Sequence, residues 1–371
     1  MVAVAGLDNH YKFSRVTFRD RNGRIVRRER LDHTDSQALR RKLAAWPKSL
    51  PVVMEASFGW QWLSDVMRAE GLRPQLANCH KVKRWAEAMG SAHTNRKDAD
   101  LLSLLPLQPT EWWRVWAAPP TVRQRREWTR LYADLRSAQT QWKNRIHGVF
   151  HRHGLFHEFS DLFGVAGRAY LAELCRDGGG VLADGALAAL RSSVRMLQAV
   201  RQELSDILRM FRKQIQANPQ AIVLRTMPGF GPILTLTVLA EIGEPSRFRS
   251  HGALASYAGL APISRDTGED ESPADPKGRK LRRRCNRTLK WALITAARAA
   301  VRKGGRWRAS FDRYTAGGKR RRNRGYIKVA REMVTVVHAI LRDGRPYSDA
   351  PPARPAGIGR HPLVRERAGS I

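Results

Sequence analysis

The sequence predicts an α/β domain at the N-terminus, followed by two long helices that pair with each other. Three observations support this prediction. Strand-like runs fill residues 1–32, a buried-type apolar run at 50–54 follows a helical segment, and two heptad-like apolar patterns begin after residue 127. The chain has 371 residues, enough for two or three domains that each have a core.

The first 32 residues predict three strands, in "VAVAGLD", "YKFSRVTF" and "RIVRRERL". Asn22-Gly23 separates the second strand from the third and is a strong hairpin signal, because both residue types tolerate the positive φ angles of a tight turn. A helix is expected next in "DSQALRRKLAAW", with Asp35 or Ser36 as its N-cap.

The run "PVVME" predicts a fourth strand that is buried on both faces, because its apolar residues do not alternate with polar ones. "GWQWLSDVMRAEG" then predicts a helix that ends at Gly71, and "RPQLANC" predicts a short fifth strand. A strand, a helix and a returning parallel strand are typical of an α/β sheet, so we expect "PVVME" beside the first strand.

Two of these strands end in a carboxylate, Asp8 and Glu55. Either acid alone is most simply a cap or an ion-pair partner. In an open α/β sheet, however, the carboxyl ends of neighbouring strands face one crevice, where ligands bind. Two such acids need a cation, and oxygen ligands favour Mg²⁺ or Mn²⁺. The pattern suits a phosphodiester site in which two ions lie about 3.5–4 Å apart.

The segment "HTNRKDADLLSLL" predicts a helix that supplies further ligands. Asn95 and Asp98 are three residues apart, so both side chains point to the same side of a helix. Asp100 points elsewhere, and we expect it to be solvated. The apolar face of the helix consists of Leu101, Leu102 and Leu105.

Two later segments have apolar residues at heptad-like spacing. They predict two long helices that form either an antiparallel arm or a dimerising coiled coil; ordinary core helices are the equally weighted alternative. The first pattern comprises Trp128, Leu131, Leu135, Ala138, Trp142 and Val149, and the second comprises Leu190, Val194, Leu197, Leu204, Phe211 and Ile215.

The chain has 67 Lys and Arg against 33 Asp and Glu, a formal net charge of +34. This excess indicates a polyanionic partner, and nucleic acids are the commonest. No apolar stretch approaches the ~18 residues of a membrane helix, so we expect no membrane partner. Three distant cysteines predict a reducing, intracellular location. The histidines of "HGVFHRHGLFH" favour nucleic-acid contact or packing over a metal site, because no acid or cysteine lies nearby.

The C-terminal half contains two kinds of phosphate-binding signal. "TMPGFGPILTLTVLAEI" has the form of a helix-hairpin-helix element, in which Gly229 and Gly231 allow a tight turn before a helix N-terminus; a packing turn is the alternative. Two basic runs are expected to contact phosphates, which sets affinity but gives no sequence specificity. Their residues are Lys277, Arg279, Lys280, Arg282, Arg283, Arg284 and Arg287, then Arg320, Arg321 and Arg322.

The order of "GLD", "VVMEAS", "TNRKDADLL", "MPGFGP", "LAEIG", "YAGLAPISRDTG" and "RTLKWAL" resembles the DEDD-type insertion-sequence transposases, relatives of the Piv invertase. The resemblance covers about residues 1–310. It implies a RuvC-like domain with a ribonuclease H fold, a coiled-coil connector and a helical transposase domain. The expected boundaries are 1–115, 116–218 and 219–343, with a disordered tail at 344–371.

The resemblance also implies Mg²⁺-dependent DNA cleavage and rejoining through a covalent hydroxyl–phosphate intermediate. Asp8, Glu55 and Asp98 match three of the four family acids, whereas Asn95 stands where the third acid is usual. Thr267 stands where the family has its nucleophilic serine, and the nearby alternatives are Ser264 and Ser272.

Double-stranded DNA, a guide (bridge) RNA that reads the target by pairing, and a homodimer or homotetramer are the implied partners. The implied location is the bacterial cytoplasm, at the nucleoid. Two alternatives stay open: a catalytically degraded nucleic-acid-binding relative and a RuvC-like junction nuclease. We favour the recombinase because both strand-end acids are present.

Overall fold

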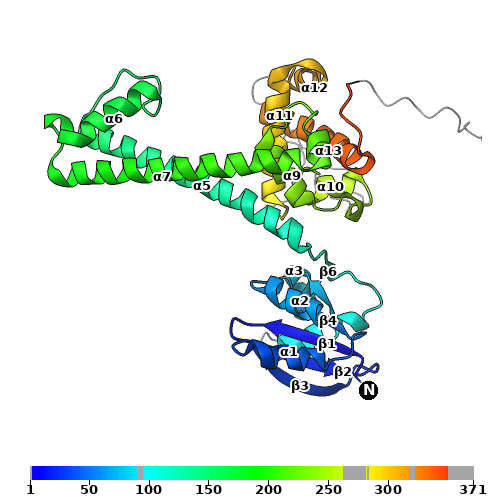
Figure 1. The fold of residues 1–371 in the computed structure, drawn as a ribbon. Helices are drawn as coiled ribbons and strands as arrows, with labels where there is room; N and C mark the ends of the chain where they lie inside the picture. Colours follow the sequence, from blue (N-terminus) through cyan, green and yellow to red (C-terminus); the bar gives the residue numbers. More distant parts are fainter. Residues whose placement is uncertain (1, 91–94, 262–280, 282–283, 317–321, 350–371) are drawn as a thin grey trace, which may run out of the picture. The chain divides into compact units, whose positions relative to one another are not determined.

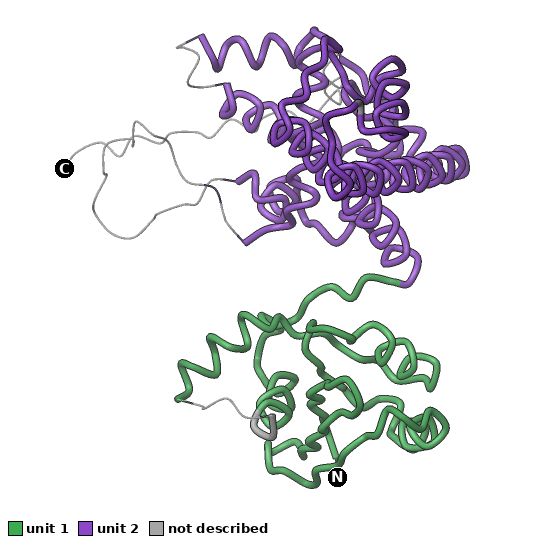
Figure 2. Tube along the Cα trace, turned by 90° about the vertical axis from the view of Figure 1, so that its left-hand side faces the viewer, with its two compact units in different colours: residues 1–119 green, residues 120–371 purple. Residues whose placement is uncertain are grey.

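The computed structural model describes residues 2–90, 95–261, 281, 284–316 and 322–349. The chain forms two compact units, residues 1–119 and 120–371 (Figure 2). The finer division at residues 218 and 343 stays a prediction. In the described part of the chain, no helix is both long and apolar enough to cross a membrane.

The first unit is a six-stranded mixed sheet with helices on both faces (Figure 1). The strand order is β3-β2-β1-β4-β5-β6; β1, β4 and β5 are parallel, as the sequence predicted for β1 and β4. Helix α3 and strand β6, which pairs antiparallel with β5, were not predicted. The elements are β1 Val4–Asn9, β2 Phe13–Arg19, β3 Ile25–Asp32, α1 Ser36–Ala44, β4 Pro51–Glu55, α2 Trp60–Ala69, β5 Arg73–Ala77, α3 Cys79–Ala88, α4 Asn95–Leu102, the 3-10 turn η1 Leu105–Leu107 and β6 Arg114–Val115.

Local signals fix the ends of these elements. Gly23 has φ +77° in the β2–β3 hairpin, a conformation that glycine adopts without strain. Asp35 is the N-cap of α1, because its carboxylate accepts the backbone N–H groups of Gln37 and Ala38. Asn78 caps α3 in the same way, directly after β5.

The sheet separates two apolar layers. Ala5, Leu7, Val52 and Met54 face one way and pack with buried residues of α1 and α2. Val53 faces the other way and packs with residues of α3 and α4. Because side chains alternate along a strand, Asp8 and Glu55 lie on the same face as Val53, the face that α3 and α4 cover.

The second unit consists of helices (Figure 1). Helices α5 and α7, of 33 residues each, run antiparallel side by side, with α6 at their far end. The arm is therefore observed, although Leu131 of the first pattern is 42% exposed; dimerisation through a coiled coil stays a prediction. The elements are α5 Pro120–Arg152, α6 Val165–Asp177, η2 Gly178–Gly180, α7 Asp184–Gln216, α8 Pro219–Leu224, α9 Pro232–Ile242, η3 Pro245–Arg247, α10 His251–Tyr257, α11 Arg287–Lys303, α12 Gly305–Thr315 and α13 Arg322–Asp343.

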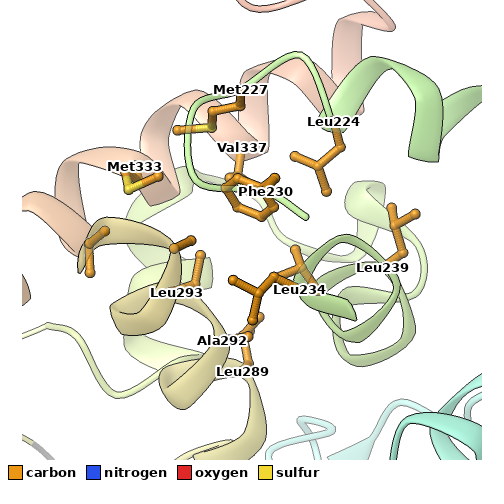
Figure 3. Packing of buried hydrophobic residues seen from close by; sticks show 14 of the residues in the cluster. Leu224, Met227, Phe230, Leu234, Leu239, Leu289, Ala292, Leu293, Met333 and Val337 are labelled. Carbon is orange, nitrogen blue, oxygen red and sulfur yellow. The ribbon is translucent and has the colours of Figure 1, made fainter. Parts of the chain in front are cut away.

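The turn between α8 and α9 packs into the core of this unit. A Cβ at Gly229 (φ +92°) would lie 2.2 Å from the carbonyl oxygen of Ala296, so only glycine lets the turn lie against α11. Phe230 is buried among residues of α8, α11 and α13, near Leu224, Leu293 and Val337 (Figure 3). This geometry supports the packing interpretation of Gly229, and the helix-hairpin-helix assignment stays a prediction.

Two other regions of the second unit pack through aromatic rings. His147 lies edge-on against Phe163, and His157 stacks on Phe159, so packing accounts for these two histidines. At the C-terminal end, Tyr347 stacks on Trp307. Residues 344–349, predicted as the start of a disordered tail, therefore contact the helical core, and 350–371 lie outside the described residues.

A buried carboxylate joins α5, α9 and α11. The Glu241 side chain is 1% exposed; its Oε2 accepts a hydrogen bond from Asn286 Nδ2 at 2.7 Å and lies 3.5 Å from Arg126 Nε. Arg130 Nη2 lies 3.5 Å from Oε1. A buried charge is tolerated only when it is paired and hydrogen-bonded, so this cluster fixes the base of the arm on the C-terminal helices.

Replacing Glu241 by alanine should lower the free energy of unfolding by about 3 kcal/mol, because two arginines and Asn286 lose their buried partner. Urea denaturation measures the change. Glu241→Gln, which retains an acceptor for Asn286, should lose less. In the matched control Glu173→Ala, an exposed pair with Arg176 is removed and the change should stay within about 0.5 kcal/mol. Equal losses for Glu241→Ala and Glu173→Ala would contradict the assignment.

Candidate active site

Asp8 and Glu55 come from neighbouring parallel strands. In the register of β1 and β4, Leu7 lies opposite Met54, so the next residue of each strand is one of the two acids. Glu55 ends β4, whereas β1 continues to Asn9 because it pairs with β2. The expectation that the two strands are parallel neighbours is confirmed, and a shared role of the two acids stays a prediction.

Helix α4 lies directly on β1 above Gly6. A Cβ at Gly6 would lie 2.1 Å from the backbone nitrogen of Ser103 and 2.5 Å from the carbonyl oxygen of Ala99. No side chain fits in that space, so the glycine of "GLD" sets the depth at which α4 approaches the sheet. Gly6 and Asp8 face the same way, and α4 therefore brings Asp98 to the face of Asp8.

A polar cluster also holds α4 on the sheet. Asp100 accepts a hydrogen bond from Thr17 Oγ1 at 2.6 Å and ion-pairs with Arg28 at 2.8 Å. Arg19, nearly buried, donates to Ser103 Oγ and to the backbone oxygen of Asp100. The expectation that Asp100 is solvated is wrong, because its partners come from β2 and β3, more than 70 residues earlier in the chain.

The electrostatics of Asp100 agree with this structural role. Burial alone would raise the pKa of its carboxyl, but the hydrogen bonds from Arg28 and Thr17 outweigh burial and lower that pKa below its ordinary value. Asp100 is thus held in its ionised form, and its contacts with β2 and β3 hold α4 on the sheet.

The pKa of Asp8 is shifted in the opposite direction to that of Asp100. Burial raises the pKa of the Asp8 carboxyl, and the charge of Asp98 raises it further, while His10 acts against both. Asp8 Oδ2 lies 2.9 Å from His10 Nε2, an ion-pair distance, yet neither atom has a partner in hydrogen-bond geometry. A buried carboxylate oxygen without an aligned donor, next to a second acid, is a place that a cation would stabilise.

Glu55 and Asp98 line one cavity of about 230 Å³. Cys79 and Lys83 of α3 line the same cavity. Burial and the charge of Glu55 raise the pKa of the Cys79 thiol, which therefore stays protonated and donates a hydrogen bond to Glu55. Sequence reasoning missed both α3 residues, although their i, i+4 spacing after the Asn78 cap could have indicated them.

The donor set fits a hard divalent cation in its chemistry, because it consists of carboxylates from β1, β4 and α4. Across the described ranges, no group of three acidic, histidine or cysteine side chains is arranged to hold one ion. Asn95 begins α4, one turn before Asp98, and its side chain lies outside what the structure describes.

Among the residues expected to contact nucleic acid, Gly229 lies in the buried turn before α9, and the other described ones lie at or shortly before the N-termini of helices. Gly231 is the N-cap of α9 with open space around it, and Arg287 and Arg322 begin α11 and α13 as exposed side chains. Arg284, also exposed, lies shortly before α11. The remaining predicted residues lie outside the described ones: Thr267, Ser264, Ser272, Lys277, Arg279, Lys280, Arg282, Arg283, Arg320 and Arg321.

Two family models match the chain. Residues 5–154 match a DEDD transposase model of the IS110 type, and residues 221–312 match a model described as Transposase IS116/IS110/IS902 family. The first match contains all of the predicted acids. The second contains the buried turn, Glu241 and the start of α11.

Individual relatives agree with these models. The chain is 32% identical over 156 residues to a 44.8 kDa protein of insertion element IS116 from Streptomyces clavuligerus, covering 42% of this chain and 38% of that protein. It is 32% identical over 157 residues to a 43.6 kDa protein of insertion element IS110 from Streptomyces coelicolor, covering 42% and 37%. It is 31% identical over 144 residues to the pilin gene-inverting protein of Moraxella bovis, covering 36% and 40%. The matched segments thus span less than half of each relative.

Gly6→Ala should destabilise the first unit by about 1–3 kcal/mol, because the added methyl forces α4 away from β1. The denaturation midpoint measures the effect. Gly185→Ala, where the new Cβ meets no atom within 4 Å apart from its chain neighbours and its own helix, is the control and should not destabilise the protein. An unchanged midpoint for Gly6→Ala would exclude the close approach.

The stability that Asp100 provides should depend on pH. Its folded pKa is lowered, so the contribution is complete above the ordinary carboxyl pKa of about 3.9 and is lost as the pH falls through the lower folded value. The melting temperatures of the wild type and Asp100→Asn should therefore differ at pH 7 and converge as the pH falls through the lowered folded pKa of Asp100. A difference that is constant with pH would refute the assignment.

Proposed function

The chain belongs to the DEDD-type IS110/IS116/IS902 transposase family, and from this premise we propose that it is a Mg²⁺-dependent DNA recombinase. It would cleave and rejoin strands through a covalent hydroxyl–phosphate intermediate. The observation that supports the proposal is that three acids lie on one face of the sheet: Asp8 and Glu55 on parallel strands, and Asp98 on the helix that packs above Gly6.

Asp8, Glu55 and Asp98, with the amide oxygen of Asn95, would hold one or two Mg²⁺ ions, and Mn²⁺ has the same ligand preference. Bound Mg²⁺ stabilises negative charge on phosphoryl oxygens and on the attacking and leaving oxygens. The raised pKa of Asp8 supports this role, since a cation would offset the repulsion between Asp8 and Asp98. Asn95 leaves the set with one negative charge fewer than four acids would give.

Lys83 adds a cation to the same cavity as Glu55 and Asp98. We include it in the proposed site as a contact to a non-bridging oxygen of the scissile phosphate. Its ammonium group would orient the phosphate and would compensate for charge that develops there.

The nucleophile would be a hydroxyl from the chain between α10 and α11, Thr267 first and Ser264 or Ser272 next. The hydroxyl oxygen would bond to phosphorus, the bond from phosphorus to the leaving deoxyribose oxygen would break, and that oxygen would take up a proton. Tyr257 and Asn286 lie on either side of this part of the chain in the sequence, and they are hydrogen-bonded to each other. Asn286 N–H donates to Tyr257 O at 2.9 Å, and Asn286 Nδ2 donates to Tyr257 Oη at 3.0 Å.

The acids belong to residues 1–119 and the candidate hydroxyls to residues 120–371. We therefore propose that a site is completed between subunits of a homodimer or homotetramer that holds two DNA duplexes. A guide RNA would select the target by base pairing, with the net charge of +34 binding both polyanions without sequence preference.

A second candidate is a nucleic-acid-binding relative that has lost catalysis. Two observations favour it: the substitutions at Asn95 and Thr267, and the absence of a preformed three-ligand group among the residues that the structure describes. A junction nuclease, which needs the acids but no hydroxyl nucleophile, is the third.

The test is incubation of the full-length protein with DNA and Mg²⁺, then mass spectrometry of any protein–DNA adduct. The recombinase should give an adduct on Thr267, Ser264 or Ser272, absent with EDTA. Asp8→Asn should reduce the adduct by more than about 100-fold, because even outer-shell changes at metal sites cost 10- to 100-fold. Asp184→Asn, on the exposed first turn of α7, is the matched control and should leave adduct formation unchanged.

Other results would reject the recombinase. Cleavage that persists when Thr267, Ser264 and Ser272 are all replaced by alanine would identify a nuclease. DNA binding without cleavage, in Mg²⁺ and in Mn²⁺, would identify the non-catalytic binder.

A further inference from the structure

A second hollow, of about 800 Å³, opens in the helical unit between α5, the start of α9 and α11. It contains none of the acids of the candidate active site. Its lining is mainly apolar, with two arginines and several hydroxyls at its edges. No acidic residue occurs among the described residues that line it, which include Tyr132, Arg136, Thr140, Arg287, Trp291 and Thr295.

Two helix faces form its sides. On α5 the lining residues Tyr132, Arg136 and Thr140 follow one another at intervals of four, as do Arg287, Trp291 and Thr295 on α11. Each of these two series thus contains one aromatic residue, one arginine and one threonine, and Ser137 and Thr288 add a further hydroxyl on each side. The Tyr132 ring is largely buried, whereas Trp291 is exposed. This pattern of rings, cations and hydroxyls matches a nucleotide, which has a base, a phosphate and a sugar.

Trp291 is the unusual member of this groove. Its side chain is 47% exposed, although indole rings of this size are mostly buried in folded proteins. The wall behind it is rigid, because α11 is fixed by the close contact of Gly229 with Ala296 and by the buried core around Leu289 and Leu293 (Figure 3). An exposed ring on a fixed helix is preorganised for stacking.

We infer that this groove binds an unpaired stretch of a DNA strand, with one base stacked on Trp291 and the flanking phosphates held by Arg136 and Arg287. The inference rests on the proposed function, since strand exchange requires strands to leave the duplex. Arg287 is the first residue of α11 and follows the candidate hydroxyls in the sequence.

Charge argues against the other occupants. A second copy of this chain would have to place an acidic surface against the two arginines of the groove, and the chain has 33 Asp and Glu against 67 Lys and Arg. An acidic segment would pair with the arginines but would leave the apolar walls uncovered. A base would stack on the apolar walls, and its flanking phosphates would pair with the arginines.

The test is a fluorescence titration of a single-stranded oligodeoxythymidine that contains one 2-aminopurine, in EDTA so that no cleavage occurs. Binding of the wild type should quench the 2-aminopurine. Trp291→Ala should abolish the quenching and weaken binding by about 5- to 150-fold, the range that corresponds to one lost stacking contact. Trp291→Phe, which keeps a ring, should retain most of both. Tyr314→Ala removes a comparably exposed ring of α12 outside the groove and should bind as the wild type does.

The arginines have a separate readout. Arg136→Ala and Arg287→Ala should each keep the quenching but reduce the slope of log K against log salt by about 0.7, the value for one phosphate contact on a single strand. Unchanged quenching and affinity in Trp291→Ala would overturn the inference. So would a tenfold preference for an RNA strand of the same sequence, which would make RNA the occupant, or for duplex DNA.

This experiment is independent of the adduct assay. Groove binding without an adduct would reject the recombinase and leave the groove intact. An adduct, together with unchanged DNA binding by Trp291→Ala, would support the recombinase and reject the groove as a binding site.

Discussion

The close packing of α4 on β1 is the constraint on which the rest of the candidate active site depends. Gly6 has no side chain, so the backbone of α4 at Ala99 and Ser103 lies where a Cβ would otherwise be. Behind this contact, Arg19 and Asp100 fasten the helix to the sheet. Without that approach, Asp98 would not share a face with Asp8 or a cavity with Glu55. Gly6 therefore sets how closely α4, which contains Asp98, packs on the face of the sheet that contains Asp8.

This arrangement is electrostatically unfavourable by itself. Burial and Asp98 both raise the pKa of Asp8, and the carboxylate oxygen that faces His10 has no aligned hydrogen-bond donor. Two residues away from Asp98, Asp100 shows the opposite behaviour, because Arg28 and Thr17 satisfy its charge. The same short helix thus contains one acid that stabilises the fold and one that repels its neighbour, a contrast that is typical of a functional site in a structural frame.

The helical unit contains many cationic side chains, and their mutual repulsion has to be offset for the helices to pack. Glu241 is buried beside Arg126 and Arg130 and neutralises charge where α5 meets α9 and α11. On another side of the same helices, Arg136 and Arg287 face an apolar hollow without any acid among its described lining residues. Cations that are paired inside support the fold, and the cations that line a groove with no acid among its described residues are placed to bind a polyanion.

The sequence by itself determined β1 to β5, α1, α2 and α4 of the first unit and the two long helices of the arm, but not α3 or β6. The Asn22-Gly23 hairpin, the parallel return of β4 beside β1 and the placement of Asp8 and Glu55 follow from turn chemistry and from the alternation of side chains, which are local properties. The tertiary structure alone decided the partners of Asp100, the cavity shared by Glu55 and Lys83, the contact of Gly229 with α11, the exposure of Leu131 and Trp291 and the docking of Tyr347. Most of these features join residues far apart in the chain. Periodicity assigns a residue to a face of its own helix or strand, but only packing determines what that face meets.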